Sequence, residues 1–317
     1  MAAGLLGGAM KLPIFRAIGT TFAFLFKHAI EILKIVWLPA ALSCALYLLI
    51  MPIYVSEVAG ATRADVIGPQ QVINQTLATL PILSVLILAS ALINTLLVTG
   101  LMKLMIRGDA PHLPVYFAPG ADELRLLWSW GLIFLGVVGL ALGFAAAIGL
   151  SQLLAAMGPG PGGIIGLVAA CVVVGVGVWL AARLSLVAPA VIARRQLGIE
   201  PSWTVTEEND WRLIGFWLLW IVPFFILASL LTPLLAAPGY LEATRDIYAA
   251  ARSPARMQAA IQHAYEIQAA GYQLTNGANV VRMIANALLT VGATTVLAIA
   301  GGAAWRLMTE EEANPST

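Results

Sequence analysis

The chain has 317 residues, of which 60% are hydrophobic and only 10% are charged, and its 17 basic and 16 acidic side chains leave a formal net charge of +1. Soluble domains contain about 45–50% apolar and about 25% charged residues, so this chain has too few charges to cover a water-exposed surface. The composition excludes a cytosolic enzyme, a disordered chain and a charge-driven nucleic-acid binder, and it predicts an integral membrane protein.

Residues 1–34 are predicted to form an amphipathic helix on the cytoplasmic face of the membrane. Apolar side chains recur there every three or four residues, at Phe15, Ile18, Phe22, Phe26, Ile30 and Leu33. Lys11 and Arg16 interrupt the apolar run, so we expect the segment to be retained rather than cleaved as a signal peptide. Two roles fit this pattern: an anchor that packs on the bundle, or a sensor of anionic lipid.

Residues 35–308 are predicted to form a transmembrane domain of six helices. A bilayer core about 30 Å thick needs about 20 apolar residues of helix. Six segments are long enough: residues 35–55, 80–102, 126–157, 164–182, 213–236 and 281–304. They lack the alternation of polar and apolar residues that a membrane barrel requires, so the predicted fold class is all-α, a polytopic membrane bundle.

The basic residues predict the orientation of the spans. Twelve of them lie beside one set of span ends, and five lie beside the other set, spread over longer loops. The positive-inside rule therefore places both termini in the cytoplasm.

The largest loop, residues 237–280, is predicted to be a periplasmic helical insertion. One helix is expected from about Tyr240 to Arg252, and Ser253 with Pro254 supplies the N-cap and first-turn residue of a second helix that ends near Ala270. Residues 309–317 are expected to be a disordered acidic tail.

The cytoplasmic loops resemble one another and predict an internal repeat. Each outward span is preceded by an acid and a base and has a tryptophan near its start: Glu31, Lys34 and Trp37, then Glu123, Arg125 and Trp128, then Asp210, Arg212 and Trp217. The ends of the returning spans are similar to one another in a weaker way: each has a base followed by leucine, at Lys103, Arg183 and Arg306. This pattern predicts three tandem helical hairpins, each with one span out and one span back.

The third cytoplasmic loop contains the best-defined motif. Its characteristic residues are Arg183, Pro189, Arg194, Arg195, Ser202, Trp203, Thr206, Asn209, Trp211, Arg212 and Leu213. Over residues 183–213 the loop resembles the signature of a bacterial family of six-span proteins, which includes the membrane domain fused to some glycerophosphoryl diester phosphodiesterases. Glu207 and Glu208 depart from the base and glycine usual there, and this sequence does not contain the phosphodiesterase domain. The resemblance implies a bacterial inner-membrane location and a lipid context, not an activity.

Arg183 interrupts an apolar stretch, residues 164–193, that would be about 45 Å long as a helix and is too long for one crossing. Either the membrane ends near Arg183, or Arg183 lies about 16 Å below the Arg194–Arg195 pair. In the second case it would be a buried charge and a candidate functional residue.

Candidate contacts with lipid headgroups or a partner protein are Arg183, Arg194, Arg195, Trp203, Asn209, Trp211 and Arg212. A candidate polar intramembrane seam consists of Asn94, Gln152, Asn286 and Thr290. The seam has two interpretations: helix packing through interhelical hydrogen bonds of about 0.6–2 kcal/mol each, or a path for a headgroup or solute. The three histidines lie in different segments, so we predict no catalytic group, metal or cofactor.

These patterns lead to one principal hypothesis and one alternative. The chain is predicted to be a non-catalytic inner-membrane module that binds phospholipids and supports another membrane or envelope protein. The alternative is a transporter of a lipid or small solute through a cavity between the hairpins. The predicted span cores contain no Asp or Glu, which weighs against coupling to protons or sodium. No nucleic-acid partner is expected, and the sequence leaves the oligomeric state open.

Overall fold

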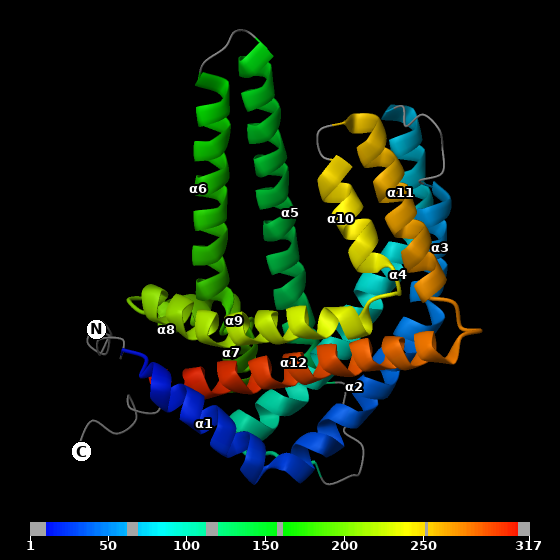
Figure 1. Cartoon of the computed structure of the whole chain (residues 1–317). Helices are drawn as coiled ribbons and strands as arrows, with labels where there is room; N and C mark the ends of the chain where they lie inside the picture. Colours follow the sequence, from blue (N-terminus) through cyan, green and yellow to red (C-terminus); the bar gives the residue numbers. More distant parts are fainter. Residues whose placement is uncertain (1–10, 62–68, 112–119, 157–160, 251–252, 310–317) are drawn as a thin grey trace. The chain divides into compact units, whose positions relative to one another are not determined.

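The computed structural model describes residues 11–61, 69–111, 120–156, 161–250 and 253–309, and the regular elements within these ranges are all helices (Figure 1). Six helices in this part of the chain are long and apolar enough to cross a membrane, which confirms the predicted number of spans. The protein is therefore an all-helical, polytopic integral membrane protein.

In chain order the helices are α1 (Ile14–Lys27), α2 (Ala29–Leu49), α3 (Met51–Ala61), α4 (Pro69–Met102), the π-helical turn η1 (Lys103–Arg107), α5 (Ala121–Ala156), α6 (Pro161–Leu184), α7 (Val187–Arg194), α8 (Ile199–Thr206), α9 (Asp210–Leu235), α10 (Tyr240–Ala250), α11 (Pro254–Gly271) and α12 (Gly277–Thr309). The predicted acidic tail, residues 309–317, lies outside the described residues except for Thr309, which ends α12.

The amphipathic segment is not one helix that continues to residue 34, so this boundary is corrected. α1 ends at Lys27, because His28 adopts φ −112° and ψ 26°, which turns the following peptide out of the helical direction. Residues 29–34 consequently belong to α2, the helix of the first span. In α1 the small side chains of Ala17 and Thr21 are buried, whereas Phe15 and Phe26 are more than 80% exposed. This is the arrangement expected of a helix whose apolar face meets lipid.

The chain divides into two compact units, which are described separately here. The first unit comprises residues 1–32, 98–221 and 296–317, and the second comprises residues 33–97 and 222–295. The first unit therefore contains the span ends that the positive-inside rule assigns to the cytoplasm. The second unit contains the helical insertion and the opposite ends of four spans.

The short helix α7 lies in the core of the first unit. Its residues Val187, Val191 and Ile192 are fully buried and pack against the end of α4 and the start of α5. Residues 164–193 do not form one helix, because α6 ends at Leu184, one residue after Arg183, and α7 begins at Val187. Pro189 falls in the first turn of α7, where its missing N–H costs little.

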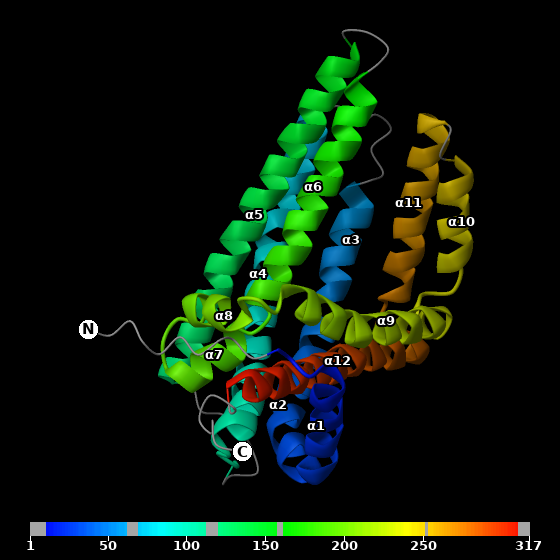
Figure 2. The ribbon, with the colours of Figure 1, turned by 90° about the vertical axis from the view of Figure 1, so that its left-hand side faces the viewer.

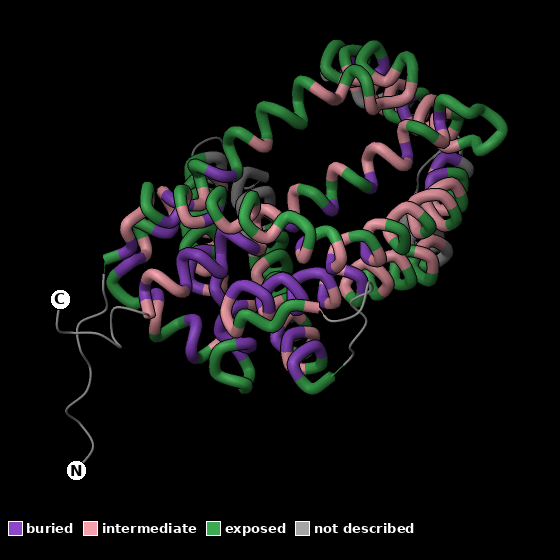
Figure 3. The backbone as a smooth tube through the Cα atoms, turned by 90° about the horizontal axis from the view of Figure 1, so that it is seen from below, coloured by how far each residue is buried: buried purple, intermediate pink, exposed green. Residues whose placement is uncertain are grey.

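Helices α5 and α6 of the same unit lie side by side in both Figure 1 and Figure 2. Large apolar side chains on them, such as Leu135 and Leu142, are about two-thirds exposed, as lipid-facing residues of a span should be. Figure 3 shows this contrast across the chain, with a dense buried region beside long runs of exposed and half-buried backbone.

In the second unit, α11 packs against both α10 and α3. The two helices predicted within residues 237–280 are present, which confirms that the insertion is helical. Ser253 is extended, with φ −134°, and Pro254 is the first residue of α11, as the sequence predicts. Gly239 adopts φ +83°, a left-handed conformation that favours glycine, just before α10.

Candidate functional site

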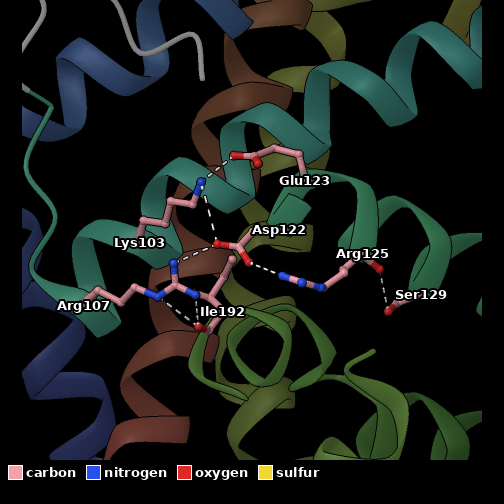
Figure 4. Close-up of polar contacts among 7 residues, drawn as sticks. All are labelled: Lys103, Arg107, Asp122, Glu123, Arg125, Ser129 and Ile192. Atoms are coloured by element: carbon pink, nitrogen blue, oxygen red, sulfur yellow. Dashed lines mark hydrogen bonds and ion pairs between the residues drawn. The ribbon is translucent and has the colours of Figure 1, made fainter. Parts of the chain in front are cut away.

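Charged residues join the end of the first hairpin to the start of the second (Figure 4). The π-helical turn η1 carries Lys103 and Arg107, and the first turn of α5 carries Asp122 and Glu123. The Lys103 ammonium lies 2.8 Å from Glu123 Oε1, and Arg107 Nη1 lies 2.8 Å from Asp122 Oδ2. Both carboxylates are nearly buried, so these ion pairs act where water screens them little.

Asp122 is the centre of this charged cluster. Asp122 Oδ1 accepts a hydrogen bond from Arg125 Nη1 at 3.0 Å. The Lys103 ammonium lies 3.9 Å from Asp122 Oδ2. Arg107 also donates to the Ile192 carbonyl near the end of α7 through Nε, at 3.0 Å, and through Nη2. One acid therefore ties η1 to the start of α5, and Arg107 extends the network to the buried helix α7.

Arg183 makes the equivalent junction between the second and third hairpins. Its guanidinium faces Asp210 with two nitrogens, at 2.6 Å from Nε to Oδ1 and 2.9 Å from Nη2 to Oδ2. The same guanidinium lies 5.5 Å from the ring centre of Trp179 and 5.2 Å from that of Trp203. Arg183 is 9% exposed, so its charge is balanced by a carboxylate and two aromatic faces in a nearly dry environment.

Helix α8 holds the end of α6 beside this ion pair. Ser202 donates its hydroxyl to the Arg183 carbonyl at 2.7 Å, and Thr206 lies 3.5 Å from the same oxygen. The carbonyls at a helix end lack partners within the helix, so these buried hydroxyls satisfy one of them. The conspicuous polar residues of the third loop thus stabilise the turn from α6 into α9.

Asn209 and Arg212 clasp the N-terminal segment. Asn209 Oδ1 accepts a hydrogen bond from the Leu12 backbone N–H at 2.9 Å, and Arg212 Nη1 donates to the Leu12 carbonyl at 3.2 Å. Leu12 is fully buried. Both polar groups of one residue's backbone are therefore bound by side chains at the start of α9.

Replacement of Asn209 by alanine is expected to loosen this clasp, because the buried Leu12 N–H loses its acceptor, at a cost of about 1–3 kcal/mol. Limited trypsinolysis should cleave the variant faster after Lys11 or Arg16, while the rest of the chain stays intact. Thr204→Ala is the matched control, because Thr204 is exposed and bonds only to its own helix at the Glu200 carbonyl. Equal cleavage rates for wild type and Asn209→Ala would contradict the clasp.

The other predicted headgroup contacts lie elsewhere. Arg194 and Arg195 are exposed at the end of α7, and Trp211 is 84% exposed at the start of α9. The seven predicted contact residues thus fall into two groups. Arg183, Trp203, Asn209 and Arg212 have partners within the protein, whereas these three present bases and an indole to the surroundings, where they can anchor the chain at headgroups.

The predicted polar seam is not gathered into one path among the described residues. Asn94 donates to the Ser90 carbonyl at 2.9 Å and Thr290 donates to the Asn286 carbonyl at 2.9 Å, so both are satisfied within their own helices. Asn286 reaches across to α9, at 3.3 Å from the Leu235 carbonyl. The side chain of Gln152 lies outside the described residues. Of these residues, Asn286 makes the interhelical hydrogen bond that the packing interpretation expects, and it also lines a cavity of the second unit.

A cavity of about 500 Å³ lies in the first unit, between α1, the start of α2, η1 and the end of α12. Four basic or imidazole side chains line it, Lys27, His28, Arg107 and Arg306, together with one acid, Glu31. Arg107 is held in place there by Asp122 and the Ile192 carbonyl. The cavity therefore combines a net positive lining with at least one rigidly positioned guanidinium, which suits an anion.

The cavity includes residues that correspond to the two ion-paired junctions. In those junctions a base at the end of a returning span, Lys103 or Arg183, pairs with an acid at the start of the next outward span, Glu123 or Asp210. Arg306 at the end of α12 and Glu31 near the start of α2 hold the corresponding positions of the third hairpin and the first, and both line the cavity.

Sequence reasoning missed this cavity. Lys27, Arg107 and Arg306 are distant in sequence and form no motif, so the sequence did not predict that they line one site. They contributed to the predicted orientation of the spans. The only available signal was the correspondence of Arg306 with Lys103 and Arg183 at the ends of returning spans. Among the described residues, no group of His, Cys, Asp and Glu has a metal-binding arrangement.

Comparison of the chain with protein-family models, with curated proteins and with solved structures gave no match. The relation of residues 183–213 to the six-span bacterial family therefore stays a prediction that depends on the residues of that loop.

Proposed function

We propose that this integral membrane protein is a non-catalytic module that binds an anionic phospholipid in the basic cavity of its first unit. The observation that carries the proposal is the lining itself: Lys27, His28, Arg107 and Arg306 surround a space of about 500 Å³ together with one carboxylate, Glu31. Basic pockets between transmembrane helices at the cytoplasmic side are suited to phosphate-bearing headgroups. The positive-inside rule assigns these span ends to that side.

The apolar side chains beside the cavity support a lipid rather than a soluble anion. Phe26 is 81% exposed and Ile30 is 70% exposed, and these two residues flank Lys27 and His28 along the chain. A lipid whose phosphate lies in the cavity would leave its acyl chains beside such an apolar stripe. A free phosphate or nucleotide has no acyl chain that could contact these apolar side chains.

A module of this kind would serve another protein of the membrane or envelope. Arg194, Arg195 and Trp211 are exposed in the same unit and offer bases and an aromatic ring to such a partner or to further headgroups. The resemblance of the third loop to a family with a membrane domain beside a lipid-degrading enzyme agrees with a supporting role.

Lys27→Gln is expected to weaken binding of phosphatidylglycerol about fivefold, because one base near an anionic headgroup contributes about 1 kcal/mol. Native mass spectrometry in a neutral detergent, with phosphatidylglycerol and phosphatidylcholine as competing probes, measures this change. Arg245→Gln is the matched control, because Arg245 is an exposed base on α10 that does not line the cavity.

Selective retention of phosphatidylglycerol by wild type and by Arg245→Gln, with loss in Lys27→Gln, supports the proposal. Equal binding of both lipids by wild type, or equal loss in the two variants, would overturn it. Movement of a fluorescent lipid across the bilayer of proteoliposomes would instead favour the transporter alternative, because a binding module has no need to move its ligand.

A further inference from the structure

A second cavity, of about 320 Å³, lies in the second unit. It is formed by the end of α2, the start of α3, the end of α9, the α11–α12 connection and the first turns of α12. These are the ends of the spans that the positive-inside rule assigns to the side away from the cytoplasm. None of its lining residues lines the basic cavity of the first unit.

The lining of this cavity carries one formal charge, that of Arg282. The guanidinium is held by Asn279, whose Oδ1 accepts a hydrogen bond from Arg282 Nη2. Asn279 is 3% exposed and is fixed in turn, because its Nδ2 donates to the Ala270 carbonyl at 2.9 Å and to the Gln273 carbonyl at 3.1 Å. A buried amide thus sets the position of the only cation in the cavity wall.

Three phenols share the wall with Arg282. They belong to Tyr47, Tyr240 and Tyr272, and burial raises the pKa of Tyr272, which the neighbouring phenols of Tyr47 and Tyr240 raise further. The hydroxyl of Tyr272 therefore stays protonated at neutral pH and can donate a hydrogen bond. Cation and hydroxyl together make the polar part of the cavity suitable for an anionic oxygen.

Most of the remaining wall is apolar, with Met51, Leu235, Met283 and Leu289 among its residues, and Thr232, Gln268 and Asn286 add neutral polar groups. Its shape depends on close backbone approach, since a Cβ at Gly271 would lie 2.5 Å from that of Ala237. The cavity therefore combines one cation and several hydrogen-bonding groups with a largely apolar wall. This distribution matches a molecule that has one anionic head and one hydrocarbon chain.

We propose that this cavity binds the anionic head of a single-chain amphiphile, with Arg282 pairing with the head and the Tyr272 hydroxyl donating to it. The shared chemistry is a terminal carboxylate or phosphate monoester on an alkyl chain. A phosphate monoester presents more oxygens to the guanidinium than a carboxylate does, whereas a carboxylate can still accept two parallel hydrogen bonds from it. A neutral head of similar size would leave Arg282 without an added partner and should bind weakly.

The test titrates the full-length protein in a neutral maltoside detergent with laurate, dodecyl phosphate and uncharged monolaurin, and measures binding by isothermal titration calorimetry. Wild type should bind at least one anionic probe tenfold or more tightly than monolaurin, and Arg282→Gln should lose that preference. Arg245→Gln is the matched control, because Arg245 is an exposed base on α10 that does not line the cavity. The stronger of the two anionic probes tells whether a fatty acid or a lipid phosphate is the source.

Two further measurements keep the proposal falsifiable if Arg282→Gln fails to fold. Arg282→Lys keeps the charge but not the two-pronged geometry, so it should retain part of the anion preference. In wild type, a diazirine-bearing fatty acid should crosslink to peptides that line the cavity, from the end of α9, the end of α11 or α12. Equal binding of all three probes, or crosslinks only to peptides that do not line the cavity, would overturn the proposal. Arg282 lines this cavity and not the basic cavity of the first unit, so loss of the anion preference in Arg282→Gln separates the two sites.

Discussion

Asp210→Ala should destabilise the protein by about 3 kcal/mol, measured as a fall in the free energy of unfolding or in Tm in detergent. The substitution removes the carboxylate that faces Arg183 with both oxygens and leaves a nearly buried guanidinium without its counter-charge. Breaking one side of a buried ion pair costs about 3–5 kcal/mol. The lower end applies here because the Asp210 side chain is 23% exposed.

A double substitution separates the cost of an unpaired charge from the value of the pair. Arg183→Met with Asp210→Leu removes both charges and should be more stable than Asp210→Ala, because an apolar pair leaves no buried charge behind. Asp246→Ala, at an exposed carboxylate on α10, should change stability little. If the double variant loses as much as the sum of the two single variants, Arg183 and Asp210 are not coupled and the predicted cost of an unpaired charge is wrong.

Gly198→Ala should be equally damaging, with an expected loss of about 3 kcal/mol, at the upper end of the usual cost of overpacking. A Cβ at Gly198 would lie 2.3 Å from the Val187 carbonyl oxygen and 2.7 Å from a Val191 methyl group. These atoms belong to α7, which is buried in the core of the first unit and has little room to move. The yield of folded protein on size-exclusion chromatography and its Tm are the readouts.

The backbone conformation of Gly198 makes this prediction specific. Its φ of −82° is one that any residue adopts, so only the missing space can account for a loss on substitution by alanine. Gly136→Ala on α5 is the control, because a Cβ there meets no atom of the described protein within 4 Å. Alanine also forms helix more readily than glycine, so this variant should be as stable as wild type or slightly more stable. A similar loss in both variants would contradict the steric explanation.

The sequence predicted the features that depend on local pattern. Bilayer thickness requires about 20 apolar residues per crossing, so six apolar segments were recognisable without any knowledge of their partners. The two helices of the insertion were predictable because Ser253 and Pro254 form a helix start that depends on neighbouring residues alone. Both predictions are confirmed by the described helices.

Hydropathy left open whether the membrane ends near Arg183 or Arg183 lies within it, and it did not predict the helix break after Leu184. Residues 187–193 are apolar, yet with Arg194 they form the separate helix α7, most of which is buried. Arg107 caps the Ile192 carbonyl from 85 residues away, so the interaction that stabilises the end of this helix leaves no trace in the local pattern. The hydrogen bond from the Leu12 N–H to Asn209 likewise joins residues that are distant in sequence, so local pattern could not predict it.

The cavities could not be predicted because they depend on which helix ends meet. Lys27, Arg107 and Arg306 come from three separate segments, and their number on one side of the membrane indicated orientation but not proximity. Arg282 was counted only among the five bases of the opposite side. The hydrogen bond that Arg282 donates to Asn279 became recognisable only with the fold of the α11–α12 connection.

The Leu12 clasp also determines the order in which the protein can be assembled. Leu12 and Asn209 are 197 residues apart, so the ribosome must add those residues before the acceptor for the Leu12 N–H exists. At about 5–20 residues per second this takes about 10–40 s. During that time Asn209 is not yet available to bind the Leu12 backbone. The exposed Phe15 and Phe26 of α1 can meanwhile contact the membrane surface or a chaperone. The clasp at Leu12, just before α1, can thus form only after the start of α9 has been synthesised.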